Sequence, residues 1–136
     1  MNNDFNTQII EEFRSHEGKV GGHFEGSPVL LLTTTGARSG KAHTTPVMYL
    51  PDGDAQYVFA SMAGAPTSPA WYHNLLANPR VTVELGTEKF EAQATVLDRA
   101  DRDRVYAQQV VLYPTFGEYE QKTTRTIPVV RLTRVS

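Results

Sequence analysis

The stretch VLLLTTTGARSGKAHTTPVMYL, residues 29–50, decides the fold of this chain. It begins as an apolar and β-branched run, is interrupted by two glycines, and resumes as a second β-rich run. This pattern predicts a β-hairpin with a glycine-bounded loop. Glycine allows positive φ and close approach of the backbone to a ligand. Four loop side chains add hydrogen-bond donors or positive charge: Arg38, Ser39, Lys41 and His43. The loop is therefore a candidate anion-binding site.

The charge distribution supports an anion site at this hairpin. The chain has 15 Asp and Glu residues against 13 Lys and Arg, yet no acidic residue occurs between Glu25 and Asp52. This local basic region favours a small anionic ligand, whereas a general nucleic-acid-binding protein would carry a broad basic face. The alternative for the loop taken alone is a solvated turn that needs glycine and tolerates charge.

Length and composition indicate one ordinary globular domain. With 136 residues, 40% hydrophobic and 21% charged, the sequence predicts a single domain over residues 1–136, with an N-terminal helix in 1–17 and a barrel in 18–134. The absence of cysteine excludes disulfides and Cys-based metal sites. The four histidines lie in different segments, so no metal site is predicted.

The sequence shows no targeting signal and no membrane-spanning signal, which bears on where the protein is found in the cell. The N-terminus has neither a basic start nor an apolar core, and no apolar run approaches the length of a membrane span. We therefore expect a cytoplasmic protein with no transmembrane segment. Weak peripheral association with a membrane stays open.

Alternating patterns predict a mainly β (α+β) fold. Beyond the hairpin, we expect strands over 56–61, 80–85, 90–96 and 127–132, and helices over 69–77, 100–112 and 115–122. About six antiparallel strands with inserted helices are expected to close as a small barrel. The N-terminal helix is expected across a barrel end, the charged run 99–104 on a solvated helix face, and Pro128 on an edge strand or bulge.

A candidate ligand slot lies next to the loop. Small antiparallel barrels bind ligands at their mouths or in clefts between strands. The residues expected near the loop are mostly apolar or aromatic: Pro46, Val47, Met48, Ala60, Ser61, Trp71 and Tyr72. A flat apolar slot beside an anion site suits a ligand with a planar ring and a charged tail. The alternative for Trp71 is a core position on an amphipathic helix.

Three ordered blocks extend the interpretation. The first is LLTTTGARSGK at 31–41, followed by TPVMYL; the second is ASMAGAP at 60–66, running into PAWYHNLLANP at 69–79; the third is LYPTF at 112–116 with RTIPVV at 125–130. Through these blocks the chain resembles the deazaflavin (coenzyme F420)-dependent nitroreductase family, whose members have an FMN-binding split-barrel-like fold. The resemblance extends from about Gly18 to Arg134, and several motifs at consistent spacing are more specific than one loop.

The resemblance implies coenzyme F420 as the cofactor and names the residues around it. One group would lie along its phosphate tail and ring: Ala37, Arg38, Ser39, Lys41, His43, Thr44, Thr45, Pro46, Val47 and Met48. A second group would border the deazaflavin: Phe59, Ala60, Ser61, Met62, Ala70, Trp71, Tyr72, His73, Asn74 and Phe116. Two positions depart from the pattern, since His43 replaces an arginine of many relatives and Met62 a lysine.

The resemblance also suggests which residues would face the substrate. Ser61 and Tyr113 match polar positions and are the predicted catalytic residues, as hydrogen-bond or proton donors. Met48 and Phe116 stand where relatives have tyrosine, so reduction of nitroimidazoles is not implied.

The sequence thus predicts an F420-dependent reductase that passes hydride from the reduced deazaflavin to a small electron-poor acceptor, such as a quinone, an enone or a nitroaromatic compound. Two alternatives stay open. Related split barrels use flavin mononucleotide (FMN), and a carrier protein could hold F420 without turnover. A homodimer is a further open expectation.

Overall fold

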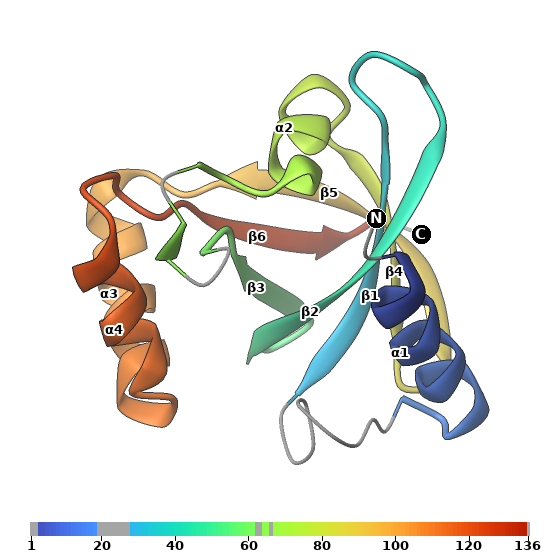
Figure 1. The fold of residues 1–136 in the computed structure, drawn as a ribbon, viewed down its shortest axis with the longest axis horizontal. Coiled ribbons are helices and arrows are strands. Elements are labelled where there is room, and N and C mark those ends of the chain that lie inside the picture. Colours follow the sequence, from blue (N-terminus) through green and yellow to red (C-terminus); the bar gives the residue numbers. More distant parts are fainter. Residues whose placement is uncertain (1–2, 19–27, 62–63, 66, 136) are drawn as a thin grey trace.

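The computed structural model describes residues 3–18, 28–61, 64–65 and 67–135. Its strands are β1 (Val29–Thr35), β2 (Ala42–Asp52), β3 (Ala55–Phe59), β4 (Arg80–Leu85), β5 (Glu88–Val96) and β6 (Val129–Arg134). Its helices are α1 (Asn3–Ser15), α2 (Ala70–Ala77), α3 (Arg99–Leu112) and α4 (Thr115–Lys122). The strands close into an antiparallel barrel in the order β1-β2-β3-β6-β5-β4 (Figure 1). The prediction of about six antiparallel strands with inserted helices is confirmed.

The predicted hairpin is the first pair of the barrel. β1 and β2 are paired from Val29 opposite Met48 to Thr35 opposite Ala42, which leaves residues 36–41 as the loop. β1 is a continuous apolar run, not an alternating one, because both of its faces are covered. Its inward residues pack in the barrel interior and its outward ones against α1. The hairpin tip and α2 rise together at the top of Figure 1.

The barrel interior forms the largest core cluster. Its buried residues come from every strand except β2 and from the residue after β3: Leu30, Leu32, Val58, Ala60, Val81, Val83, Phe90, Ala92, Ala94, Val130 and Leu132. Two residues of α2, Trp71 and Leu75, complete it, with exposures of 6% and 2%. The interpretation of Trp71 as a core residue is thus confirmed, since its side chain packs in the barrel interior. Val96, at the end of the strand expected over 90–96, is 38% exposed.

The outer face of the barrel is covered on two sides. α3 and α4, at the left of Figure 1, pack over β3 and β6, where Phe59, Tyr106 and Phe116 make edge-to-face ring contacts. The arrangement buries aromatic surface between the helices and the outside of the sheet.

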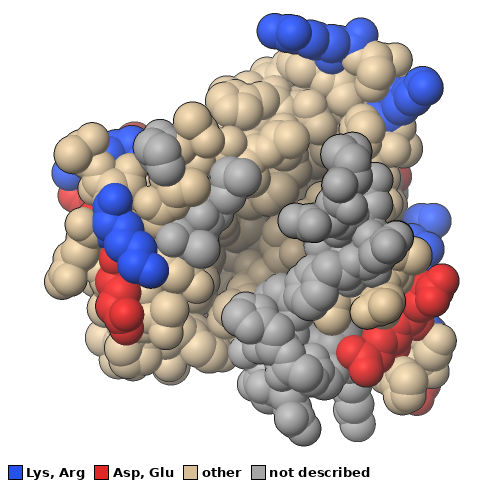
Figure 2. Space-filling model, in the orientation of Figure 1, with Lys and Arg blue, Asp and Glu red and all other residues tan. Residues whose placement is uncertain are grey.

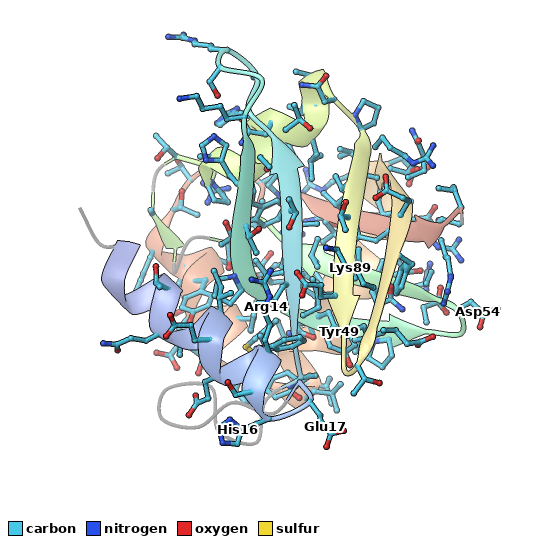
Figure 3. The ribbon with its side chains drawn as sticks, turned by 90° about the vertical axis from the view of Figure 1, so that its right-hand side faces the viewer. Arg14, His16, Glu17, Tyr49, Asp54 and Lys89 are labelled. Atoms are coloured by element: carbon cyan, nitrogen blue, oxygen red, sulfur yellow. The ribbon has the colours of Figure 1, made fainter. Side chains whose placement is uncertain are left out.

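α1 lies on the barrel wall, so the prediction that it crosses a barrel end is wrong. Its Phe13 packs on Val29 and Leu31, the outward residues of β1. Arg14 donates two hydrogen bonds to Glu84 of β4, Nε to Oε1 at 3.0 Å and Nη2 to Oε2 at 2.8 Å. Figure 3 shows Arg14 where α1 meets the strands. The outward apolar residues of β1 therefore determine where this helix docks.

Two expectations for the C-terminal part need correction. Arg102 belongs to the charged run expected on a solvated face, yet it is 7% exposed and pairs with Glu120 of α4 at 2.8 Å. Pro128 does not mark an edge strand, because the barrel is closed and β6 begins after it. The Pro128 carbonyl instead accepts the Ala60 N–H at 3.0 Å. Both features depend on partners distant in sequence.

Candidate functional site

A cleft of about 810 Å³ opens at the tip of the hairpin, between the β1–β2 loop, α2 and the N-terminal half of α1. The residues that line it are Thr7, Ile10, Thr34, Gly36, Ala37, Arg38, Ser39, Ala42, His43, Thr44, Thr45, Ala70, Trp71, His73 and Asn74. Its size lies within the range of small-molecule and cofactor sites. The candidate anion loop therefore borders a cleft, and its binding of an anion stays a prediction.

Glycine is favoured at the two ends of the loop for different physical reasons. A Cβ at Gly36 would collide with the Ser39 hydroxyl and crowd the His43 ring, so both side chains would have to move to admit one. Gly40 has φ +70°, the left-handed region that glycine adopts without strain. The Gly36 N–H donates to Lys41 O at 2.8 Å, and the Gly40 N–H donates to Gly36 O at 3.0 Å. These bonds make a compact six-residue turn.

Asn74 of α2 joins the loop to the helix. Its Oδ1 accepts the Ala37 N–H at 3.1 Å, and its Nδ2 donates to Thr34 Oγ1 at 3.2 Å. One turn later, Asn78 Nδ2 donates to the Thr35 carbonyl at 3.4 Å. The loop, the end of β1 and α2 are thus held as one unit.

Positive charge gathers at this end of the molecule. Arg38 and Lys41 are exposed on the loop, and His43 and His73 are exposed beside it. Figure 2 shows Lys and Arg side chains at the upper right, where Figure 1 places the hairpin tip, above a hollowed surface without charge. An anionic group of a ligand would meet cations at the tip while the rest of that ligand lay on uncharged surface.

The cleft can accept a planar ring beside the loop. Ala37, Ala42 and Ala70 line it with small side chains, and Trp71 adds an aromatic one. The donor set of Arg38 and the loop amides suits a phosphate, and the small apolar residues leave room for a ring system. These residues fit a cofactor with a planar head and an anionic tail.

Many of the predicted cofactor residues come together here. The cleft contains Ala37, Arg38, Ser39, His43, Thr44, Thr45, Ala70, Trp71, His73 and Asn74. Lys41 lies on the loop but is not among the lining residues. Pro46, Val47 and Met48 follow on β2. Met48 packs both against the cluster of Phe13, Val29 and Leu31 and against the cluster under α3 and α4. Val47 and Tyr72 pack against the barrel interior. Their contact with a cofactor stays a prediction.

The remaining predicted residues lie elsewhere. Phe59 and Phe116 are both 6% exposed in the cluster under α3 and α4, and Ala60 is fully buried in the barrel core. None of the three lines the cleft. Met62 lies outside the described residues, as do residues 19–27 of the glycine-rich connector.

Ser61 and Tyr113, the predicted proton donors, also lie outside the cleft lining. Ser61 follows β3 and is 8% exposed, and Tyr113 is the half-buried C-cap of α3. Burial, and to a smaller extent the electrostatic interaction with Tyr113, raises the pKa of Tyr49. Figure 3 shows Tyr49 toward the lower end of the barrel, away from the hairpin tip.

Arg125 holds the segment that carries Ser61. Its guanidinium donates to the carbonyls of Ala60, Ser61 and Ala65 at 3.0, 2.9 and 2.9 Å, and to Ser68 Oγ at 3.2 Å. Desolvation by these groups lowers the pKa of Arg125. The RTIPVV block was quoted for its resemblance, but this link between it and the segment before α2 was missed.

Five lining residues were missed: Thr7, Ile10, Thr34, Gly36 and Ala42. Thr34, Gly36 and Ala42 border the predicted loop, so their place in the quoted hairpin was the available signal. Thr7 and Ile10 come from α1, and no local pattern tells which wall of a barrel a helix will cover. Their part in the cleft depends on the docking of Phe13 and Arg14.

Possible metal ligands and membrane-spanning helices were sought in the described part of the chain. No group of three or more His, Asp or Glu residues there could hold a metal ion. Within the same residues, no helix is both long and apolar enough to cross a membrane.

A profile of the F420H(2)-dependent quinone reductase family matches residues 7–134. The chain belongs to this family. An F420H(2)-dependent quinone reductase of Mycobacterium tuberculosis is 40% identical over 126 residues, which cover 90% of this chain and 85% of the relative. Family membership therefore extends over the hairpin, the cleft and the C-terminal block alike.

Solved structures agree with the family match. One described as an F420-H2 dependent reductase is 37% identical, with a TM-score of 0.71, and covers 82% of this chain and 99% of that chain. Another, described as a domain-swapped dimer, is 33% identical, with a TM-score of 0.73, and covers 97% and 99%. The predictions of a split β-barrel, of a reductase and of coenzyme F420 as its cofactor are confirmed at the level of the family.

Proposed function

We propose that this protein transfers hydride from reduced coenzyme F420 to a quinone. The family and its curated relatives are named for this reaction. The observation that carries the proposal is the cleft at the hairpin tip, where the predicted loop and α2 residues meet around Arg38. Among the acceptors expected from sequence, the family name favours the quinone over the enone and the nitroaromatic compound.

The chain's residues bind and orient the cofactor. Bound F420 supplies the hydride chemistry itself. Arg38 and neighbouring loop amides bind the anionic tail, because charge-assisted hydrogen bonds to phosphate are strong and directional. Trp71 and Ala70 form the wall beside the ring and exclude water from it.

Proton delivery completes quinone reduction, since the oxygen that gains electron density must be protonated. Ser61 and Tyr113 are the proposed donors. Tyr49 is a third candidate, because its partly buried phenol interacts electrostatically with that of Tyr113. Each hydroxyl can stabilise the developing oxyanion by a hydrogen bond.

A binding titration separates the cofactors. F420 and FMN should be titrated side by side into the purified protein, with tryptophan fluorescence as the signal because Trp71 lines the cleft. Clear preference for F420 supports the proposal. Equal or tighter binding of FMN would contradict it, and F420 binding without turnover on any quinone would leave the carrier function.

We further propose a homodimer in the cytoplasm. A structural relative described as a domain-swapped dimer, covering 97% of this chain, supports self-association. Light scattering on the purified protein tests it, and a monomer at all concentrations would contradict it. Vesicle sedimentation tests the predicted weak membrane association.

A further inference from the structure

The hairpin loop uses most of its own backbone donors internally. The N–H groups at positions 36, 37, 40 and 41 each donate to a partner inside the protein, the last of them to Ser39 Oγ at 3.2 Å. The N–H groups of Arg38 and Ser39 have no partner within the described residues. Both residues are exposed and line the cleft. Two successive free N–H groups at the cleft can both donate to one anion.

The Asn74 amide determines which donors remain free. The Ala37 N–H can only donate, so the Asn74 atom that faces it must be the oxygen, and the nitrogen must then face Thr34. Thr34 is 1% exposed on β1, so it provides a fixed point for this amide. One side chain of α2 thereby bonds both to strand β1 and to the loop.

We propose that Asn74 is a positioning residue: it occupies the Ala37 N–H and holds the loop so that the Arg38 and Ser39 N–H groups bind the phosphate of the cofactor tail. Sequence resemblance placed Asn74 against the deazaflavin ring instead. The inference rests on the proposed function and concerns how the tail is recognised. Without Asn74, the Ala37 amide is released and the loop loses its link to α2.

Four variants test the role by binding. Asn74→Ala should weaken F420 binding roughly tenfold, about the effect of one well-placed hydrogen bond, and should leave binding of a tail-less deazaflavin unchanged. Thr34→Val should act in the same direction, and the double variant should be no weaker than Asn74→Ala alone, because both changes break one network. Asn78→Ala is the matched control, since it bonds the strand carbonyl of Thr35 and not the loop.

If Asn74→Ala lost affinity for F420 and for the tail-less deazaflavin equally, Asn74 would contact the ring directly and the inference would be overturned. Unchanged F420 affinity would also overturn it. If wild-type protein bound the tail-less compound but gained nothing from the tail, the loop would not recognise phosphate. If it bound neither ligand, the proposed function itself would fail.

Amide NMR gives a readout independent of turnover. In the ligand-free protein, the Ala37 amide should exchange with solvent more slowly than those of Arg38 and Ser39, and Asn74→Ala should remove this difference. Added inorganic phosphate, and then F420, should shift the Arg38 and Ser39 signals more than the Ala37 signal. A largest shift at Ala37, or fast Ala37 exchange in the wild type, would contradict the proposed arrangement.

Discussion

Arg38 is exposed at the rim of the cleft, in a stretch without acidic residues. Its guanidinium has no carboxylate partner within the described residues, so it is available to an anionic tail. We expect Arg38→Ala to lose about 1–3 kcal/mol of F420 binding free energy, the range for a charge-assisted hydrogen bond. Isothermal titration measures this loss. A tail-less deazaflavin should bind both proteins alike, and an equal loss for both ligands would show that Arg38 does not contact the tail.

Tyr113 is half-buried and packs beside the α3–α4 cluster, so its ring also has a structural role. Tyr113→Phe keeps the ring and removes only the hydroxyl. If the hydroxyl protonates or polarises the quinone, turnover should fall roughly tenfold or more with F420 affinity unchanged. Steady-state kinetics measure it. Undiminished turnover would assign Tyr113 to packing and leave Ser61 or Tyr49 as the donor.

At the scale of elements, α1 supplies Thr7 and Ile10 to the cleft and is held by the Arg14–Glu84 pair. The hydrogen bond from Arg14, more than any other interaction, lowers the pKa of Glu84. The pair therefore stabilises the fold above the unfolded-state pKa of Glu84, near 4.3, and this contribution is lost as pH falls through the lower folded-state pKa.

Glu84→Gln should thus cost on the order of 1 kcal/mol of unfolding free energy at neutral pH. The difference from wild type should begin to shrink as the pH falls below about 4.3 and should vanish only below the folded-state pKa of Glu84. Denaturant melts at several pH values measure it. Glu88→Gln is the control, because its pair with Arg134 is long, at 3.3 Å, and exposed. A difference that persisted at acid pH would assign the loss to packing and not to the ion pair.

Arg125 connects the segment before β6 to the segment before α2 through four hydrogen bonds. Lysine keeps the charge but cannot reproduce the planar fork. We expect Arg125→Lys to lower the unfolding free energy by about 1–3 kcal/mol and to reduce turnover, since Ser61 lies on that segment. Thermal melts and kinetics measure the two effects. Arg131→Lys, changed at an exposed pair with Asp52 at 3.6 Å, should have little effect on either.

For the whole molecule, local sequence patterns predicted the helices, the strands and the candidate anion loop. They did not predict how the helices pack on the barrel. The hairpin followed from its own glycines and β-branched residues. Asp98 caps α3 through a local bond, since its carboxylate accepts the Asp101 N–H at 2.9 Å. Arg102 was placed wrongly in solvent, because its partner Glu120 and the Ile127 carbonyl are 18 and 25 residues away.

The site divides in the same way. The loop residues and α2 residues were predicted together because the resemblance joins two blocks of sequence, and both line the cleft. Phe59, just before the second block, and Phe116, in the third block, were also predicted at the cofactor, but their outward strand and helix positions place them under α3 and α4. The walls contributed by α1 could not be predicted, since they depend on long-range docking.

The most direct test of the account is hydride transfer itself. Purified protein is mixed with reduced F420 and a soluble quinone without oxygen, and recovery of the oxidised F420 absorbance is followed with time. The account predicts catalysed formation of F420 and hydroquinone in equal amounts, reduced in Arg38→Ala when the cofactor is limiting. No rate above the protein-free mixture for any quinone, or a rate supported equally by reduced FMN, would contradict it.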